Sequence, residues 1–150
     1  MRTPSTTEIQ RVSGLDEVGD VIESHFVTID EAKIDRFVAE HGDRNRMHTS
    51  DEYARAQDFR NRVAPGVLCI AQLMGIAYEL GLTDGSFFTQ MLCDFLAPVY
   101  PGDSIALRLM LKEQKVYRRL GKRKVKIAAE IVNQDQVVVQ STEWSGMILC

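Results

Sequence analysis

Asp43 and His48 lie five residues apart in a polar segment, and their side chains could transfer protons together. A loop of that length can fold back so that both side chains face one point. A carboxylate and an imidazole that face one water molecule can pass protons in opposite directions. Histidine titrates near neutral pH, and a nearby carboxylate can fix its tautomer. Spacing alone also fits an aspartate that caps a turn and a histidine on the surface, so both interpretations stay open.

The dipeptide Pro65-Gly66 is a second candidate feature, because it begins a long apolar segment. Proline is common at the start of a helix. The free N–H groups in the first turn of a helix stabilise an anion, and here they could hold an oxygen that gains negative charge. Gly66 would also let a ligand approach the backbone closely.

The 150 residues are expected to form one domain, residues 1–150, with residues 1–14 as a loose leader. Hydrophobic residues make up 45% and charged residues 26%, which is ordinary for a globular domain. The net charge of −3 argues against nucleic-acid binding. No segment has the roughly 20 apolar residues of a transmembrane helix, and no signal peptide is evident. The three cysteines lack metal-site spacing and favour a reducing, cytoplasmic location.

Helix signals occur through the first half of the chain. Thr28 and Glu31 have the form of a capping box, so a helix is expected from Ile29 to about His41. Gly42 would end this helix, because glycine readily adopts the left-handed conformation found there.

The remaining elements are a short helix, a long apolar helix and several strands. Ser50 can cap the short helix. The long helix, at about residues 66–81, is apolar almost all round, and such a helix is buried on every side. Alternating patterns predict strands over residues 21–27, 87–96, 105–112, 124–132 and 137–149. This order favours an α+β fold in which an antiparallel sheet wraps around one central buried helix.

Four motifs occur in order along residues 20–149. They are Phe37 with GDRNRMH at 42–48 and Ala54, then FRNRVAPG at 59–66, FLAPVYPGD at 95–103 and NQD at 133–135. With them the sequence resembles the MaoC-like, (R)-specific enoyl-CoA hydratase family of the hotdog fold. In that family the corresponding motifs are G-D-x-N-P-[apolar]-H-x5-A after an aromatic residue, F-x3-[IV]-A-H-G, F-x-x-P-V-x-P-G-D and N-Q-[DN].

The resemblance implies a hydro-lyase that hydrates a trans-2-enoyl thioester of CoA or acyl carrier protein, or dehydrates the 3-hydroxyacyl thioester. It implies that Asp43 and His48 hold the water and move its protons, that the Gly66 amide binds the thioester carbonyl, and that Asn45 orients the loop or the water. No metal or redox cofactor is implied, because the thioester already acidifies the C2 proton. The family's joined sheets imply a homodimer with the acyl tunnel along its interface.

Three positions depart from the family pattern. Arg46 replaces the proline of N-P, Pro65 replaces the histidine of A-H-G, and His41 replaces a small residue before G-D. The helix after Gly66 also lacks the early serine or threonine of many members. The Asp, Asn, His and Gly of the motifs remain, so these changes concern the substrate more than the reaction and indicate a divergent branch.

Basic residues gather at two places. Arg44, Arg46, Arg60 and Arg62 flank the motifs and could contact the pyrophosphate of CoA, a phosphopantetheine phosphate or an acidic acyl group, although a solvated face is the simpler interpretation. The run at 118–126 (RRLGKRKVK) is expected to be a solvated hairpin turn. The functional alternative is that it binds the 3′-phosphate of CoA or an acidic acyl carrier protein.

Two other functions stay open. One is an acyl-CoA thioesterase, because hotdog folds carry both activities and a fold alone does not decide the chemistry. The Asp-x-Asn-x-x-His order favours hydration over hydrolysis. The other is a non-catalytic thioester-binding subunit, which the changes at Arg46 and Pro65 motivate. Cys69 is a weak candidate nucleophile, because it lies in an apolar helix without an evident base.

Overall fold

The computed structural model describes residues 12 and 14–150. Most of the expected leader, residues 1–11 and 13, lies outside these described residues. Val12 is 8% exposed and belongs to the hydrophobic core. The expectation of a loose leader is therefore wrong at this residue. Its burial is stabilising, because moving an apolar side chain out of water lowers the free energy.

Six strands form one antiparallel sheet. Their bounds are β1 (Val21–Glu23), β2 (Val27–Thr28), β3 (Phe87–Phe95), β4 (Ser104–Tyr117), β5 (Lys122–Asn133) and β6 (Val138–Leu149). The sheet order is β1-β4-β5-β6-β3, and β2 also pairs with β4. The single strand expected over residues 21–27 is thus two short pieces, both on β4. At the other side, β3 pairs with β6 alone among the described strands, which leaves an open edge.

Alternation along β4 and β5 explains which face of the sheet is buried. Successive side chains of a strand point to opposite faces, and every second residue here is aliphatic. The buried set is Ile105, Leu107, Leu109, Leu111, Val125, Ile127, Ala129 and Ile131. These are the residues that the sequence predicts to face inward, and the α+β class expected from the sequence is confirmed.

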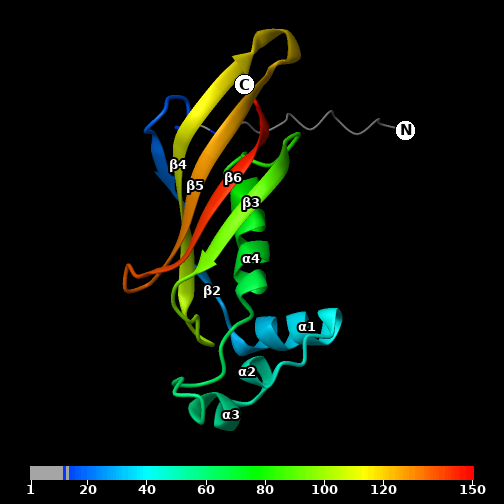
Figure 1. Ribbon diagram of the computed structural model, residues 1–150, viewed down its shortest axis with the longest axis vertical. Coiled ribbons are helices and arrows are strands. Elements are labelled where there is room, and N and C mark those ends of the chain that lie inside the picture. The colour runs from blue at the N-terminus through cyan, green and yellow to red at the C-terminus, as the bar shows by residue number, and fades with distance from the viewer. Residues whose placement is uncertain (1–11, 13) are drawn as a thin grey trace, which may run out of the picture.

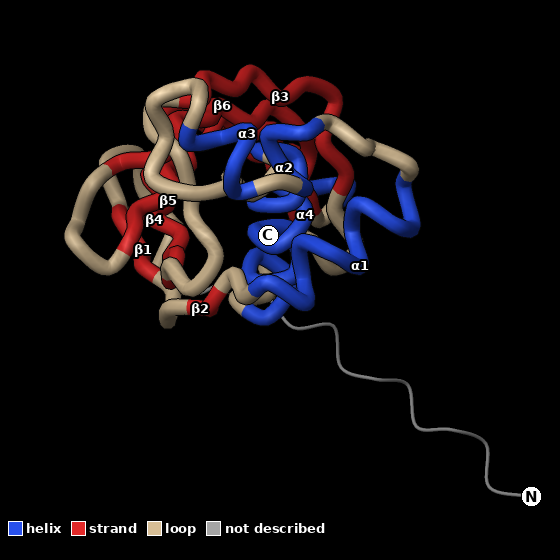
Figure 2. The backbone as a smooth tube through the Cα atoms, turned by 90° about the horizontal axis from the view of Figure 1, so that it is seen from below, coloured by secondary structure: helices blue, strands red, loops and turns tan. Residues whose placement is uncertain are grey.

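The helix α4 (Gly66–Glu79) lies along the concave face of the sheet (Figure 1). Seen along its axis, the sheet curves around it (Figure 2). The side toward the sheet is buried, but Val67 and Tyr78 are 54% and 57% exposed. Burial on every side is therefore wrong for the single chain, because the sheet covers only part of the helix circumference.

Three shorter helices gather beyond the N-terminal end of α4 (Figure 1). They are α1 (Glu31–His41), α2 (Arg46–Thr49) and α3 (Asp51–Arg55). Asp30, not Thr28, caps α1, because the Asp30 carboxylate accepts from the Lys33 N–H at 2.7 Å. Thr28 instead continues β2, and its hydroxyl lies 3.0 Å from the Ser104 hydroxyl. The predicted end of α1 at Gly42 and the predicted cap of α3 at Ser50 are both confirmed.

Candidate active site

His48 is held in place by the backbone of a distant segment. It lies on α2, which Asn45 caps by accepting a hydrogen bond from the Met47 N–H at 3.0 Å. The His48 Nδ1 atom lies 2.7 Å from the Val63 carbonyl oxygen. Because a carbonyl oxygen can only accept, Nδ1 carries the proton, and in the neutral ring Nε2 is left with its lone pair.

Asp43 faces the free nitrogen of this imidazole. Gly42 adopts a left-handed conformation, with φ of 73°, and turns the chain sharply after α1. The Asp43 Oδ1 atom then accepts from the Asn45 N–H at 3.2 Å, a local turn typical of aspartate. Its Oδ2 lies 3.7 Å from His48 Nε2. The structure therefore brings the predicted pair together, and it gives Asn45 a place in the turn between them.

The segment before α4 is clamped from both sides. The Val63 N–H donates to the Met47 carbonyl at 2.9 Å, and the Ala64 N–H donates to the Val99 carbonyl at 2.8 Å. These bonds tie the histidine-bearing helix to the start of α4. Sequence reasoning missed Val63, because its contribution is a carbonyl oxygen that every residue type has.

Gly66 begins α4 and lies under the ring of Phe95. A Cβ atom at this position would overlap the Phe95 ring, so a larger residue does not fit unless that ring moves. The Gly66 N–H donates to no acceptor among residues 12 and 14–150. A free N–H in the first turn of a fourteen-residue helix suits an oxygen that carries negative charge. Pro65, which replaces the family's histidine, precedes the helix without a side-chain cap.

A pocket of about 380 Å³ connects the histidine with the start of α4. Most of its wall is apolar. The lining residues are His48, Phe59, Val63, Ala64, Gly66, Cys69, Phe95, Leu96, Ala97, Pro98, Val99 and Gln140. Burial raises the pKa of the Cys69 thiol to about 12. Cys69 is therefore a neutral part of the wall near pH 7 and not an activated nucleophile.

The four arginines around the site differ in what they contact. Arg62 donates to Asp35 at 2.7 Å, its side chain is only 11% exposed, and this hydrogen bond raises the pKa of the guanidinium. Arg62 thus fastens α1 to the clamped segment and is already neutralised. The guanidinium groups of Arg46 and Arg60 each lie 4.2 Å from the centre of a tyrosine ring. Arg44 is exposed.

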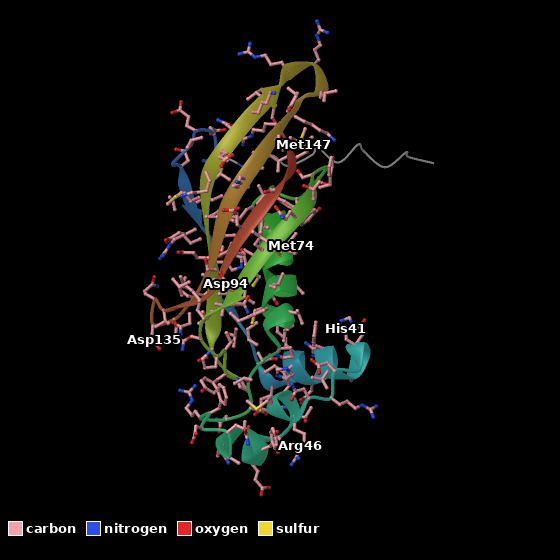
Figure 3. The ribbon with its side chains drawn as sticks, in the orientation of Figure 1. His41, Arg46, Met74, Asp94, Asp135 and Met147 are labelled. Carbon is pink, nitrogen blue, oxygen red and sulfur yellow. The ribbon has the colours of Figure 1, made fainter. Side chains whose placement is uncertain are left out.

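The stacked arginines lie at the surface around the site. Figure 3 shows Arg46 at the end of the molecule beyond α4, the same end as His41. The Arg46 guanidinium lies over the Tyr53 ring, and the Arg60 guanidinium lies over the Tyr100 ring. Stacking on an aromatic face restricts the motion of an arginine side chain. The N–H donors at the edge of the guanidinium plane stay available to bind a phosphate. His41 packs against Phe37 of its own helix, with ring centres 4.4 Å apart.

The basic run at 118–126 lies at the opposite end of the sheet (Figure 1). It contains the short helix η1 (Arg118–Leu120) and the first residues of β5. The turn is confirmed, but Arg123 is 6% exposed and donates to Gln114 at 3.0 Å, so it is not solvated. Beside the turn, on the outer face of the sheet, lies a hollow of about 440 Å³. It is lined by Thr89, Gln90, Glu113, Gln114, Lys115, Lys124, Val125, Lys126 and Ser145.

In the described part of the chain, no three His, Cys, Asp or Glu residues lie together in a way that could hold a metal ion. Across the same residues, no helix combines the length and the hydropathy that crossing a membrane requires.

Comparison with known proteins gives one family and many similar folds. A family model described as MaoC like domain matches residues 16–134. The R-hydratase PhaJ1 from Pseudomonas aeruginosa is 26% identical with a TM-score of 0.71, and the match covers 89% of this chain and 81% of that chain. The MaoC-like dehydratase from Rhodospirillum rubrum is 22% identical with a TM-score of 0.76, over 89% and 92%.

A third similar structure is the HadBC (3R-hydroxyacyl-ACP dehydratase) complex from Mycobacterium tuberculosis. It is 17% identical with a TM-score of 0.72, over 90% of this chain and 99% of that chain. A comparison with curated protein sequences finds no match. The structural matches confirm the hotdog fold that the four motifs predict.

Proposed function

The chain belongs to the MaoC-like domain family, and on that premise we propose that it is a hydro-lyase acting on an acyl thioester. It adds water to a trans-2-enoyl thioester or removes water from the 3-hydroxyacyl thioester, within fatty-acid or polyketide metabolism in the cytoplasm. One observation carries the proposal. Asp43 and His48 lie 3.7 Å apart, and His48 lines an apolar pocket that also contains the start of α4.

The start of α4 would bind the thioester carbonyl. The free Gly66 N–H would donate to this oxygen, which becomes negative as the enolate forms. One donor of this kind typically contributes about 10²–10³-fold to a rate. The apolar wall of the pocket would hold the acyl chain and exclude bulk water, which strengthens the hydrogen bond to the oxygen.

Asp43 and His48 would share the protons of the reacting water. One group takes a proton from the water as its oxygen adds to C3, and the other delivers a proton to C2. In His48 this exchange takes place at Nε2, because the Val63 carbonyl holds the Nδ1 proton. No metal or redox cofactor takes part in this proposal, since the thioester itself acidifies the C2 proton.

The carrier of the acyl group would lie against the exposed arginines. Arg44 and Arg46 would meet the phosphates of CoA or of an acyl carrier protein's phosphopantetheine. Arg60, which also lies 3.9 Å from Asp103, would join them only with its remaining N–H donors. Arg62 is left out of this set, because its charge is paired with Asp35. Its contribution is to hold the segment that carries Val63.

We also propose a homodimer of about 34 kDa, twice 16.9 kDa. An open strand edge is a template for pairing with another chain, and β3 offers one beside the uncovered side of α4. Phe87, Leu92 and Phe95 on β3 are each more than half exposed, as are Val67 and Tyr78 on α4. Light scattering tests this proposal, and a fully active monomer would contradict it.

The decisive experiment follows hydration of crotonyl-CoA and longer trans-2-enoyl thioesters through loss of the conjugated double bond. Asp43→Asn and His48→Ala should each lower kcat/KM by about 10²–10⁴-fold, the usual contribution of a general acid or base. The matched control is His41→Ala, which removes a nearby histidine whose contact is with Phe37.

Three results would change the proposal. If both variants keep turnover within about twofold of the wild type, the acid–base assignment fails. Release of free thiol from saturated acyl-CoA would identify a thioesterase. Binding of acyl-CoA by a folded dimer without turnover of any enoyl thioester would identify a non-catalytic subunit.

A further inference from the structure

One polar side chain is buried in the mostly apolar wall of the pocket, next to Gly66. It belongs to Gln140 on β6, which is 2% exposed. The Gln140 Nε2 atom donates to the Gly66 carbonyl at 3.0 Å. Because a carbonyl oxygen only accepts, this contact fixes which end of the amide carries the nitrogen. The other end is therefore Oε1.

The Oε1 atom of Gln140 is buried and accepts no hydrogen bond from residues 12 and 14–150. Most buried polar atoms in folded proteins have a partner, because they lose their hydrogen bonds to water. Ser86, Arg123 and Trp144 also have such an atom within the described chain. Of these four residues, Gln140 alone borders one of the two hollows described above.

Gln140 occupies a position where an apolar side chain would satisfy the fold. From Gln140 onward, every second residue of β6 is buried, namely Gln140, Thr142, Trp144, Gly146 and Ile148. The Thr142 hydroxyl is satisfied within the sheet, since it donates to the Ala129 carbonyl. The Gln140 oxygen has no such partner among the described residues, so their packing does not account for it.

We propose that Gln140 is a substrate-binding residue whose amide oxygen accepts a hydrogen bond from a donor on the bound thioester. This inference rests on the proposed function and narrows its substrate class to thioesters that present a hydroxyl or an amide N–H inside the pocket. Two parts of a substrate can supply that donor. One is a hydroxyl on the acyl chain, and the other is the amide N–H nearest the sulfur in the pantetheine arm.

The expected consequence is discrimination by the unpaired oxygen. A ligand with a donor restores the hydrogen bond that burial took from Oε1. A ligand without a donor leaves the oxygen both dry and unpaired, and sites built for a hydrogen bond reject analogues that lack it. The Gly66 contact holds the amide in the orientation that this selection needs.

Calorimetric binding of saturated thioesters tests the inference without turnover. One ligand series compares unsubstituted acyl-CoA with the same chain carrying one hydroxyl at successive carbons. The other compares an acyl N-acetylcysteamine thioester, which has the pantetheine amide, with an alkyl thioester of equal length, which has none. The wild type should bind the donor-bearing member of at least one pair about tenfold more tightly, the size of one net hydrogen bond.

Gln140→Met keeps the length of the side chain and removes the acceptor, so it should bring that affinity ratio to about 1. The matched control, Thr142→Val, removes a buried polar group two residues away that is already satisfied, and it should keep the wild-type ratio. Thermal unfolding establishes that each variant is folded. Should Gln140→Met not fold, the wild-type ratios and Gln140→Leu carry the test.

The outcomes separate this inference from the proposed function. Equal affinities within every pair in the wild type, or an unchanged ratio in Gln140→Met, would overturn the role of Gln140 alone. Failure of the wild type to bind any thioester would overturn the proposed function and the inference with it. If Gln140→Met lowers the affinity ratio in the acyl-CoA series, the donor is the acyl hydroxyl. If it lowers the ratio for the short thioesters, the donor is the pantetheine amide.

Discussion

The two hollows of the molecule have similar volumes, about 380 Å³ at the start of α4 and about 440 Å³ on the outer face of the sheet. The walls of the outer hollow are residues of four strands, next to irregularities in the pairing of β3 and β4. Its Lys126 is paired with Glu113 at 3.2 Å and lies 3.9 Å from Glu143. The inner hollow is lined by the start of α4, by the loops before α4 and after β3, and by single residues of α2, β3 and β6. Its polar groups are held singly among apolar ones.

Volume alone would therefore not single out the proposed active site. A reaction needs polar groups held in an apolar surrounding, where a hydrogen bond or a charge has a stronger effect than in water. The inner hollow has these groups at His48, Gly66 and Gln140. The outer hollow has several charged side chains, and its Lys126 is already paired with Glu113 and Glu143. Substitutions on the two sides should therefore differ strongly in their effect on activity.

The largest expected effect in this comparison is at Gly66. Gly66→Ala would push its new methyl group against the Phe95 ring, so either this ring or the start of α4 must shift. We expect kcat/KM for a good enoyl thioester to fall by about 10²-fold, since misplacement by about 1 Å can cost that much. Gly75→Ala, in the same helix with open space around it, is the control. Equal activity of both variants would show that the helix start is not part of the site.

A smaller effect is expected at Arg62, which joins α1 to the segment that carries Val63. Arg62→Gln removes the hydrogen bond to Asp35 and the weaker contact with the His48 carbonyl. The looser histidine should lower kcat about tenfold while KM changes little, because the substrate is not touched. The control is Arg36→Gln, which replaces an exposed arginine of α1 and should leave kcat unchanged. An increase in KM alone would mean that Arg62 binds the substrate.

The outer hollow should show almost no effect on chemistry. Lys115 and Lys124 face each other directly across β4 and β5, and like charges so placed repel each other. Replacing both by serine should change kcat/KM for enoyl-CoA by less than about twofold and leave the midpoint of thermal unfolding equal or slightly higher. A loss of activity with CoA substrates would move the carrier's phosphates to this face.

The smallest expected effect is the alkylation of the Cys69 thiol in the inner pocket. With a thiol pKa of about 12 caused by burial, only about one molecule in 10⁴ is a thiolate at pH 8. Mass spectrometry after iodoacetamide treatment should find Cys150, which is exposed, modified and Cys69 intact. Unfolding should make Cys69 reactive. Rapid alkylation of Cys69 in the native protein would contradict its assignment to the wall.

Local features of the fold could be predicted from the sequence, whereas contacts between distant segments could not. Gly42 and Ser50 act within a few residues of themselves, so their roles are visible in the chain. The alternation of β4 and β5 is visible for the same reason. The cap predicted at Thr28 is wrong because Thr28 pairs with β4 instead, and that pairing depends on a strand more than seventy residues away.

The candidate site divides in the same way. The spacing of Asp43 and His48 indicates that they can meet, since only a short turn separates them. The contact of Arg62 with Asp35 and the approach of Gln140 to Gly66 depend on how α1 and β6 pack, and no local pattern reveals them. The exposed side of α4 could not be predicted either. A helix that is apolar all round gives no sign of which side its own sheet covers and which side is left for another chain.

The bond from His48 to the Val63 carbonyl has a consequence for how such proteins can vary. A main-chain oxygen is present whatever side chain position 63 carries, so drift at that position leaves the tautomer of the histidine unchanged. The requirement falls instead on the path of the backbone, which the bonds of Val63 to Met47 and of Ala64 to Val99 maintain. Insertions or deletions between residues 49 and 63 should therefore be far less tolerated during divergence than substitutions there.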